Sequence, residues 1–265
     1  MDIKNIKLAI FDIDDTLIER GEILIKPSAY QAIKTLEEKG VQVMIATGRA
    51  YYFIQDDVFQ RVKPDYVVTI NGSCVFNKER DHIVYITPTR QDVEAIIQIC
   101  RQHNIGVAGK MLDEMHVYHG LETFLTSYLK GSPKEHILLD YQDAELGDEI
   151  PMGLFLMGDE TFIETLRPVY PELKFAKAYR DAYDIYSVNA GKIKGIETVL
   201  GKLSLTWDEV IAFGDAENDQ DMLRHAAIGV AMGNATDTLK EIADYVTTDI
   251  DDHGIYNALK HLNLI

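Results

Sequence analysis

The chain has 265 residues, 46% of them hydrophobic and 26% charged, which suffices for one large domain or two smaller ones with packed cores. A formal net charge of −17 argues against nucleic acids and anionic membranes as partners, because both are bound by basic surfaces. No apolar run approaches the ~20 residues of a membrane span, no signal-peptide pattern opens the chain, and two cysteines cannot build a disulfide framework. We therefore expect a cytoplasmic protein.

The first part of the chain alternates predicted strands and helices. Buried strands are predicted at IKLAIFDI (6–13), VQVMIATG (41–48) and PDYVVTING (64–72), since each is a short apolar run followed by turn residues. A helix is predicted over 26–40, with a start signal at Pro27–Ser28 and a stop at Gly40, and another over 49–60. This alternation predicts right-handed crossovers and a parallel sheet.

The pattern changes from about Asp81 to Asp184. Alternating segments such as MHVYH (115–119), MGLFLMG (152–158) and LKFAKAY (173–179) are separated by helical stretches at 89–104 and 159–170. Such an arrangement predicts an antiparallel sheet backed by helices, in a separate α+β unit.

The parallel style returns after a helical segment at 191–205, with strands at 209–215, 228–233 and 244–248 and a last helix from about Asp252. We therefore predict an α/β fold with a Rossmann-like, doubly wound parallel-sheet core. The core comprises residues 1–82 and 186–265, and an α+β domain at 83–185 is inserted in it. An insertion with two linkers suggests a lid.

Polar residues follow the predicted core strands where each strand ends: DIDDT (12–16), ATGR (46–49), NG (71–72) and GDAEND (214–219). Taken singly, these are an Asx turn, a helix start or a surface loop. Ligands bind beyond the carboxyl ends of the strands in open α/β sheets, so together they indicate one site. Three aspartates within four residues repel one another, and a cation or a basic side chain must offset that repulsion.

These motifs, in this order and with a lysine before GIETVL, resemble the haloacid dehalogenase-like (HAD) hydrolase superfamily. More narrowly, they resemble the Cof-type phosphatases that carry a large α/β (C2-type) cap. The resemblance implies a phosphoric monoester hydrolase that uses Mg²⁺. Asp12 would be the nucleophile that forms an aspartyl-phosphate, and Asp14 the general acid and base. Asp12, the carbonyl of Asp14 and Asp215 would hold Mg²⁺.

The remaining roles carried over from the family concern the phosphate. Thr47 and the amides of Ile13 and Gly48 would bind its oxygens, and Asn218 would orient it. Lys194 would balance charge between Asp12 and the phosphoryl group, and Asp219 would support the metal or that lysine. Arg49 is a further candidate for contact with the phosphate or for holding the hinge.

Two positions depart from the family pattern. Asp15 stands where the family most often has Gly; it adds a negative charge, although its side chain can also cap the following turn. The lysine has two candidates, because Lys192 and Lys194 lie two apart and point in different directions on a helix. The family's usual Lys-Gly dipeptide favours Lys194.

The predicted function is Mg²⁺-dependent hydrolysis of small phosphorylated metabolites, with sugar phosphates as the leading class. One alternative is a phosphosugar mutase, which interconverts two esters where a phosphatase releases inorganic phosphate. Another is a non-catalytic phospho-acceptor or ligand sensor, although Asp14 and a lid have little use there. The segment DEMHVYHGLE (113–122) resembles a transition-metal site, but a polar edge of the inserted domain is the simpler interpretation. No oligomeric state is assigned.

Overall fold

The computed structural model describes residues 5–129, 132, 134–142 and 144–265. The chain divides into two compact units. The first comprises the chain up to Thr47, Ile54–Val84 and everything from Lys192 onward; the second comprises Gly48–Phe53 and Tyr85–Gly191. The predicted boundaries were 82/83 and 185/186. Within the described residues, no helix has the length and apolar character needed to cross a bilayer.

The first unit is built on an eight-stranded sheet that is parallel from β14 through β3, with β4 antiparallel to β3. From edge to edge its strands are β14 (Tyr245–Val246), β13 (Ile228–Ala231), β12 (Val210–Gly214), β1 (Leu8–Phe11), β2 (Gln42–Ala46), β3 (Tyr66–Thr69), β4 (Cys74–Asn77) and β5 (His82–Tyr85). The central strands β1 and β12 are buried along their whole length, as their unbroken apolar runs predict.

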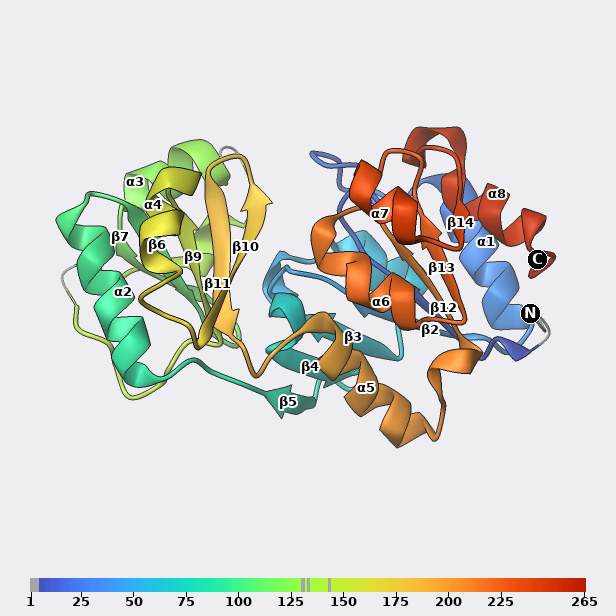
Figure 1. Cartoon of the computed structure of the whole chain (residues 1–265), viewed down its shortest axis with the longest axis horizontal. Helices are drawn as coiled ribbons and strands as arrows, with labels where there is room; N and C mark the ends of the chain where they lie inside the picture. Colours follow the sequence, from blue (N-terminus) through green and yellow to red (C-terminus); the bar gives the residue numbers. More distant parts are fainter. Residues whose placement is uncertain (1–4, 130–131, 133, 143) are drawn as a thin grey trace. The chain divides into compact units, whose positions relative to one another are not determined.

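Helices cover both faces of this sheet, which confirms the doubly wound α/β fold. Figure 1 shows α1 (Pro27–Glu38) and α8 (Gly254–His261) on one side, and α5 (Lys192–Leu203), α6 (Gln220–His225) and α7 (Asp237–Ile242) on the other. Pro27 opens α1 at the position where its missing N–H costs nothing, and Gly40 follows the helix with φ +84°. The predicted start and stop signals are therefore correct.

The second unit has a six-stranded sheet. From edge to edge its strands are β10 (Leu173–Tyr179), β11 (Ala182–Ser187), β9 (Gly153–Met157), β6 (Gly106–Lys110), β7 (Met115–His119) and β8 (Leu138–Asp140). Helices α2 (Arg90–Gln102) and α4 (Glu160–Leu166) pack their apolar sides into one core with it. The pairing is antiparallel except between β7 and β8, which are parallel because a long connection through the short helix α3 (Leu121–Thr123) brings the chain back in the same direction.

The helix predicted over 49–60 is wrong. The segment instead forms a 3₁₀ turn at Tyr51–Phe53 and a π-helical turn at Val58–Val62. A single helix is excluded because Gly48–Phe53 packs with the second unit and the chain belongs to the first unit again from Ile54. The buried carboxylate of Asp57 also accepts the amide of Ile25 at 2.9 Å, which anchors the second half of the segment.

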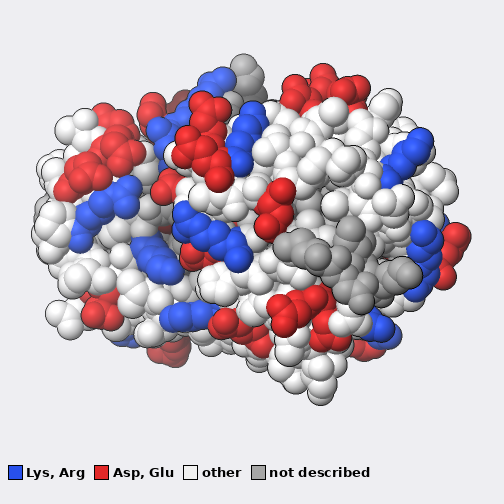
Figure 2. Space-filling model, turned by 45° about the vertical axis from the view of Figure 1, so that its right-hand side comes forward, with Lys and Arg blue, Asp and Glu red and all other residues white. Residues whose placement is uncertain are grey.

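Acidic and basic side chains are interspersed on the molecular face drawn in Figure 2. On that face, Lys and Arg side chains lie among Asp and Glu side chains and do not merge into one continuous basic surface. Binding to a nucleic acid backbone depends on such a surface.

Candidate active site

Two acidic segments from distant parts of the chain meet where the central strands β1 and β12 of the first sheet end. Strands β1 and β12 are parallel neighbours in register, with Phe11 opposite Phe213 and their rings stacked at 4.9 Å. The residues that follow these strands, Asp12 and Asp215, therefore emerge side by side. The amide of Asp12 donates to the carbonyl of Phe213 at 3.1 Å, which fixes the start of the acidic segment. The expected convergence at the carboxyl ends of the strands is present.

Lys192, and not Lys194, contacts the nucleophile candidate. Lys192 Nζ lies 2.7 Å from Asp12 Oδ1 and 2.7 Å from Asp219 Oδ1, and it is 5% exposed. The expectation of Lys194 is corrected here, because Lys194 lies on the exposed side of α5. The buried side of that helix carries Lys192, Gly195, Ile196, Val199 and Leu200.

A close approach of α5 to the sheet carries Lys192 to this depth. A Cβ added at Gly195 would lie 2.8 Å from Val68 Cγ1 of β3, so only glycine allows the helix to pack at this distance. Lys192 is three residues before Gly195 and therefore on the same face of the helix. Its side chain is thus directed to the strand ends.

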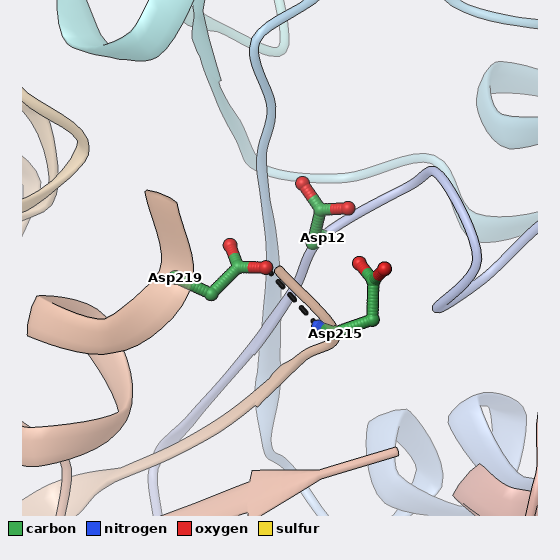
Figure 3. A group of neighbouring side chains, drawn as sticks. All are labelled: Asp12, Asp215 and Asp219. Atoms are coloured by element: carbon green, nitrogen blue, oxygen red, sulfur yellow. Dashed lines mark hydrogen bonds between the residues drawn. The ribbon is translucent and has the colours of Figure 1, made fainter. Parts of the chain in front are cut away.

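Asp219 is fully buried and uses both of its carboxylate oxygens within the protein. Oδ1 accepts from Lys192. Oδ2 accepts the amide of Asp215 at 3.1 Å, which is the dashed line in Figure 3, and the amide of Ala216 at 3.2 Å. Gly214 makes room for it, since a Cβ at that position would lie 2.5 Å from the Cβ of Asp219. Asp219 therefore holds the lysine and the backbone of the loop that carries Asp215.

Burial makes the ionised carboxylates costly. It raises the pKa of Asp12 to about 7, with the neighbouring charges of Asp219 and Asp14 adding to the rise and Lys192 opposing it. Burial likewise raises the pKa of Asp215 to about 9, and the charges of Asp12 and Asp219 add to it. For Lys192 burial acts in the opposite direction, but the two carboxylates outweigh it and raise the pKa of the ammonium group. One ammonium group does not balance these carboxylates.

The cluster has the donor chemistry of a site for a hard divalent cation. One carboxylate oxygen from each of Asp12, Asp215 and Asp219 lies within 4.8 Å of the other two. Among the residues described by the structure, this is the one group of three or more such side chains with that spacing. Asp219 is occupied by Lys192 and two amides, so Asp12 and Asp215 are the members whose oxygens suit a cation such as Mg²⁺.

Thr47 and Asn218 are connected through a third residue, Asn71. Thr47 is 1% exposed at the end of β2, and its amide donates to the carbonyl of Val68 at 2.8 Å. The carbonyl of Thr47 accepts the amide of Asn71 at 3.1 Å, and the side-chain amide of Asn218 donates to Asn71 Oδ1 at 3.1 Å. The strand end NG, noted in the sequence, therefore lies between two of the predicted phosphate-binding residues.

Asp14 and Asp15 belong to the turn that leaves β1. The carbonyl of Ile13 accepts three successive amides, from residues 16, 17 and 18, and Asp14 is half-buried beside it. Asp15 has φ +57°, a left-handed conformation that glycine adopts without strain and that Asp tolerates better than most other residues. Its Oδ1 accepts the amide of Arg20 at 2.8 Å, so the side chain does cap the turn.

The other predicted residues fall in the second unit. Gly48 follows Thr47 directly, and Arg49 Nη1 donates to the carbonyl of Phe53 at 2.9 Å, which closes the 48–53 segment on itself. The segment 113–122 does not gather into a metal site. His116 Nε2 lies 2.6 Å from Glu114 Oε1, whereas His119 Nε2 lies 3.0 Å from Asn104 Oδ1.

Comparisons with known proteins agree on one family. Residues 9–259 match a family model described as haloacid dehalogenase-like hydrolase. The 5-amino-6-(5-phospho-D-ribitylamino)uracil phosphatase YcsE of Bacillus subtilis (strain 168) is 27% identical over 259 residues, which cover 97% of this chain and 96% of that protein.

Solved structures give the same result. The HAD subclass IIB sugar phosphatase BT4131 matches with a TM-score of 0.87 and 28% identity, covering 98% of this chain and 100% of that chain. BT1666 from Bacteroides thetaiotaomicron, described among the phosphatases of the HAD superfamily, matches with a TM-score of 0.86 and 26% identity, covering 98% and 96%.

Proposed function

Since this chain belongs to the haloacid dehalogenase-like hydrolases and is a phosphatase of that family, we propose that it hydrolyses small phosphorylated metabolites in a Mg²⁺-dependent reaction. We place the reaction on Asp12, through a covalent aspartyl-phosphate. The observation that carries the proposal is the contact of Lys192 with both Asp12 and Asp219, beside Asp215, at the carboxyl edge of the sheet.

Asp12 is the nucleophile in this proposal. An oxygen of its carboxylate attacks phosphorus, a P–O bond to Asp12 forms, and the P–O bond to the leaving group breaks. The attacking group must be ionised, and burial opposes ionisation by raising the pKa of Asp12 to about 7. Lys192, hydrogen-bonded to Asp12 Oδ1, favours the ionised form and also fixes the orientation of the carboxylate.

Asp14 serves both halves of the reaction. It donates its proton to the oxygen of the leaving alcohol, and it then accepts a proton from the water that attacks the aspartyl-phosphate. The second step breaks the P–O bond to Asp12, releases inorganic phosphate and restores both carboxyl groups. The half-buried position of Asp14 on the turn after Asp12 supports this assignment.

Asp12 and Asp215 would hold Mg²⁺, together with the backbone carbonyl of Asp14. When bound, the cation supplies positive charge that neutralises the clustered carboxylates and the phosphate oxygens. Asp219 acts indirectly, because it orients Lys192 and the amide backbone of residues 215 and 216.

Thr47, Asn218 and the amides of Ile13 and Gly48 are the proposed phosphate-binding groups. Each would donate a hydrogen bond to an oxygen of the phosphoryl group. The hydrogen bonds that Asn71 makes support this: its amide donates to the carbonyl of Thr47 after β2, and its Oδ1 accepts from Asn218 after β12, so both residues lie next to Asn71. Arg49 remains a candidate for the same role.

Sugar or polyol phosphates are the proposed substrate class. BT4131 is named a sugar phosphatase, and the substrate in the name of YcsE carries a phosphorylated ribityl chain. Both leaving groups are polyhydroxylated, and both proteins match this chain over nearly its whole length.

A panel of phosphate esters tests the proposal. Sugar phosphates, polyol phosphates, nucleotides and a generic aryl phosphate are incubated with the protein and Mg²⁺, and inorganic phosphate is measured. We expect the highest kcat/KM among the sugar or polyol esters, and loss of activity in Asp12→Asn and after chelation of Mg²⁺. Release of no phosphate from any ester, or conversion of one ester into another without release, would contradict it.

A further inference from the structure

A turn with an unusual backbone conformation follows β3. Ile70, Asn71 and Gly72 all have positive φ angles, of +48°, +50° and +92°. Left-handed conformation is costly for a β-branched residue such as Ile70, typically by ~1–3 kcal/mol. Such a conformation is kept only where surrounding contacts stabilise it. In this turn, the contacts include the hydrogen bonds of Asn71 with Thr47 and Asn218.

Asn71 is 2% exposed and is hydrogen-bonded to residues that follow two other strands, β2 and β12. Its amide donates to the carbonyl of Thr47, which follows β2, and its Oδ1 accepts from Asn218, in the loop that follows β12. Both partners are proposed phosphate-binding residues. The left-handed turn is what directs the amide and the side chain of Asn71 to these separate partners.

We propose that Asn71 is a positioning residue of the phosphatase site, which orients the side-chain amide of Asn218 toward the phosphoryl group. The proposal rests on the proposed function. Asn71 acts without touching the substrate: it is buried, and its side-chain oxygen is directed to Asn218. Asn218 is itself exposed, so its side chain would sample several rotamers without this bond.

The substitution Asn71→Gly isolates the side chain. Glycine adopts the left-handed conformation without strain and keeps the amide that donates to Thr47, while the side-chain bond to Asn218 is lost. Asn71→Gly is made in the natural protein and in Asn218→Ala, and kcat/KM for the best ester of the panel is measured with Mg²⁺. Thermal unfolding confirms that each variant is folded.

We expect Asn71→Gly to lower kcat/KM about tenfold in the natural protein and less than about twofold in the Asn218→Ala background, because residues that act as one unit are not additive. Equal losses in both backgrounds, or no loss in the natural protein, would overturn the proposal. Asn104→Gly is the matched control: Asn104 also has a left-handed backbone, with φ +55°, and its Oδ1 also accepts a side-chain donor, His119. Its kinetics should not change.

A second readout separates this inference from the proposed function. The side-chain amide resonances of Asn218 are followed by NMR in the natural protein and in Asn71→Gly, without substrate. A shift or broadening of these resonances on substitution is expected even if no ester of the panel is hydrolysed. Unchanged resonances would overturn the positioning role, whatever the enzyme's activity.

Discussion

Lys192 Nζ lies 2.7 Å from Asp12 Oδ1, although 180 positions separate the two residues in the chain. The same ammonium group is 2.7 Å from Asp219 Oδ1, so it joins the N-terminal and C-terminal acidic segments. With both carboxylates and the ammonium buried, each charge depends on the others for its stability.

The two lysines of α5 should behave differently. Lys192→Met removes the charge beside Asp12 and should lower kcat/KM by about 10²–10³-fold, the usual effect of losing one preorganised electrostatic contact. It should also destabilise the protein, since Asp219 is left buried without its cationic partner. Lys194→Met, two positions away on the exposed side, should keep kcat/KM within about twofold. Steady-state kinetics compare the two variants at a temperature below the unfolding transition of both. A larger loss of kcat/KM in Lys194→Met than in Lys192→Met would refute the assignment of Lys192.

Substitution by alanine should lower the stability of the protein at Gly214 and raise it at Gly201. At Gly214 the new Cβ would lie 2.5 Å from the Cβ of Asp219, and overpacking of this kind costs about 1–3 kcal/mol. At Gly201, on the exposed side of α5, no atom lies within 4 Å, and alanine should stabilise the helix by about 0.5–1 kcal/mol. Denaturant unfolding measures both changes. Equal stability of the two variants would argue against the close packing of Asp219 on Gly214.

The left-handed backbone at Asp15 predicts different stabilities for the glycine and alanine variants at this position. Asp15→Gly and Asp15→Ala both remove the bond to the Arg20 amide, but only alanine is strained at φ +57°. We expect Asp15→Ala to be less stable than Asp15→Gly by about 1 kcal/mol, while Asp15→Gly keeps the activity of the natural protein. A higher unfolding midpoint for the alanine variant would contradict this backbone conformation.

A second buried ion pair lies in the other unit, between Lys110 of β6 and Asp184 of β11. The two side chains are 4% and 8% exposed, and Lys110 Nζ lies 2.5 Å from Asp184 Oδ1. Asp184→Leu leaves the ammonium without its carboxylate and should cost about 3–5 kcal/mol of unfolding free energy. Adding Lys110→Met should recover part of this loss, since neither charge is then buried alone. A double variant less stable than Asp184→Leu would exclude this explanation.

The convergence of Asp12 and Asp215 could be predicted because it depends on residues that directly follow each strand. Apolar runs at 6–13 and 209–215 predict buried parallel strands, and the residues that follow such strands share one edge, as Asp12 and Asp215 do. The helical pattern of α5 also distinguishes between the two lysines, because Ile196, Val199 and Leu200 define a buried face that includes Lys192. The Lys-Gly dipeptide favours Lys194, whereas this periodicity favours Lys192, which is the lysine that contacts Asp12.

Other features depend on tertiary contacts that one segment does not reveal. Residues 49–60 have the composition of a helix, but they are divided between the two units. The parallel pairing of β7 with β8 depends on the path of the connection between them. The positioning role that we propose for Asn71 could not be predicted, because its contacts with Thr47 and Asn218 join segments that are distant in the chain.

The most direct test of the central claim is mass spectrometry of the acid-quenched reaction with Mg²⁺ and the best ester of the panel. We expect a peptide that contains Asp12 and carries the mass of one added phosphoryl group, and we expect this added mass to be absent in Asp12→Asn. A phosphoryl group found on another residue, or hydrolysis retained in full by Asp12→Asn, would contradict it.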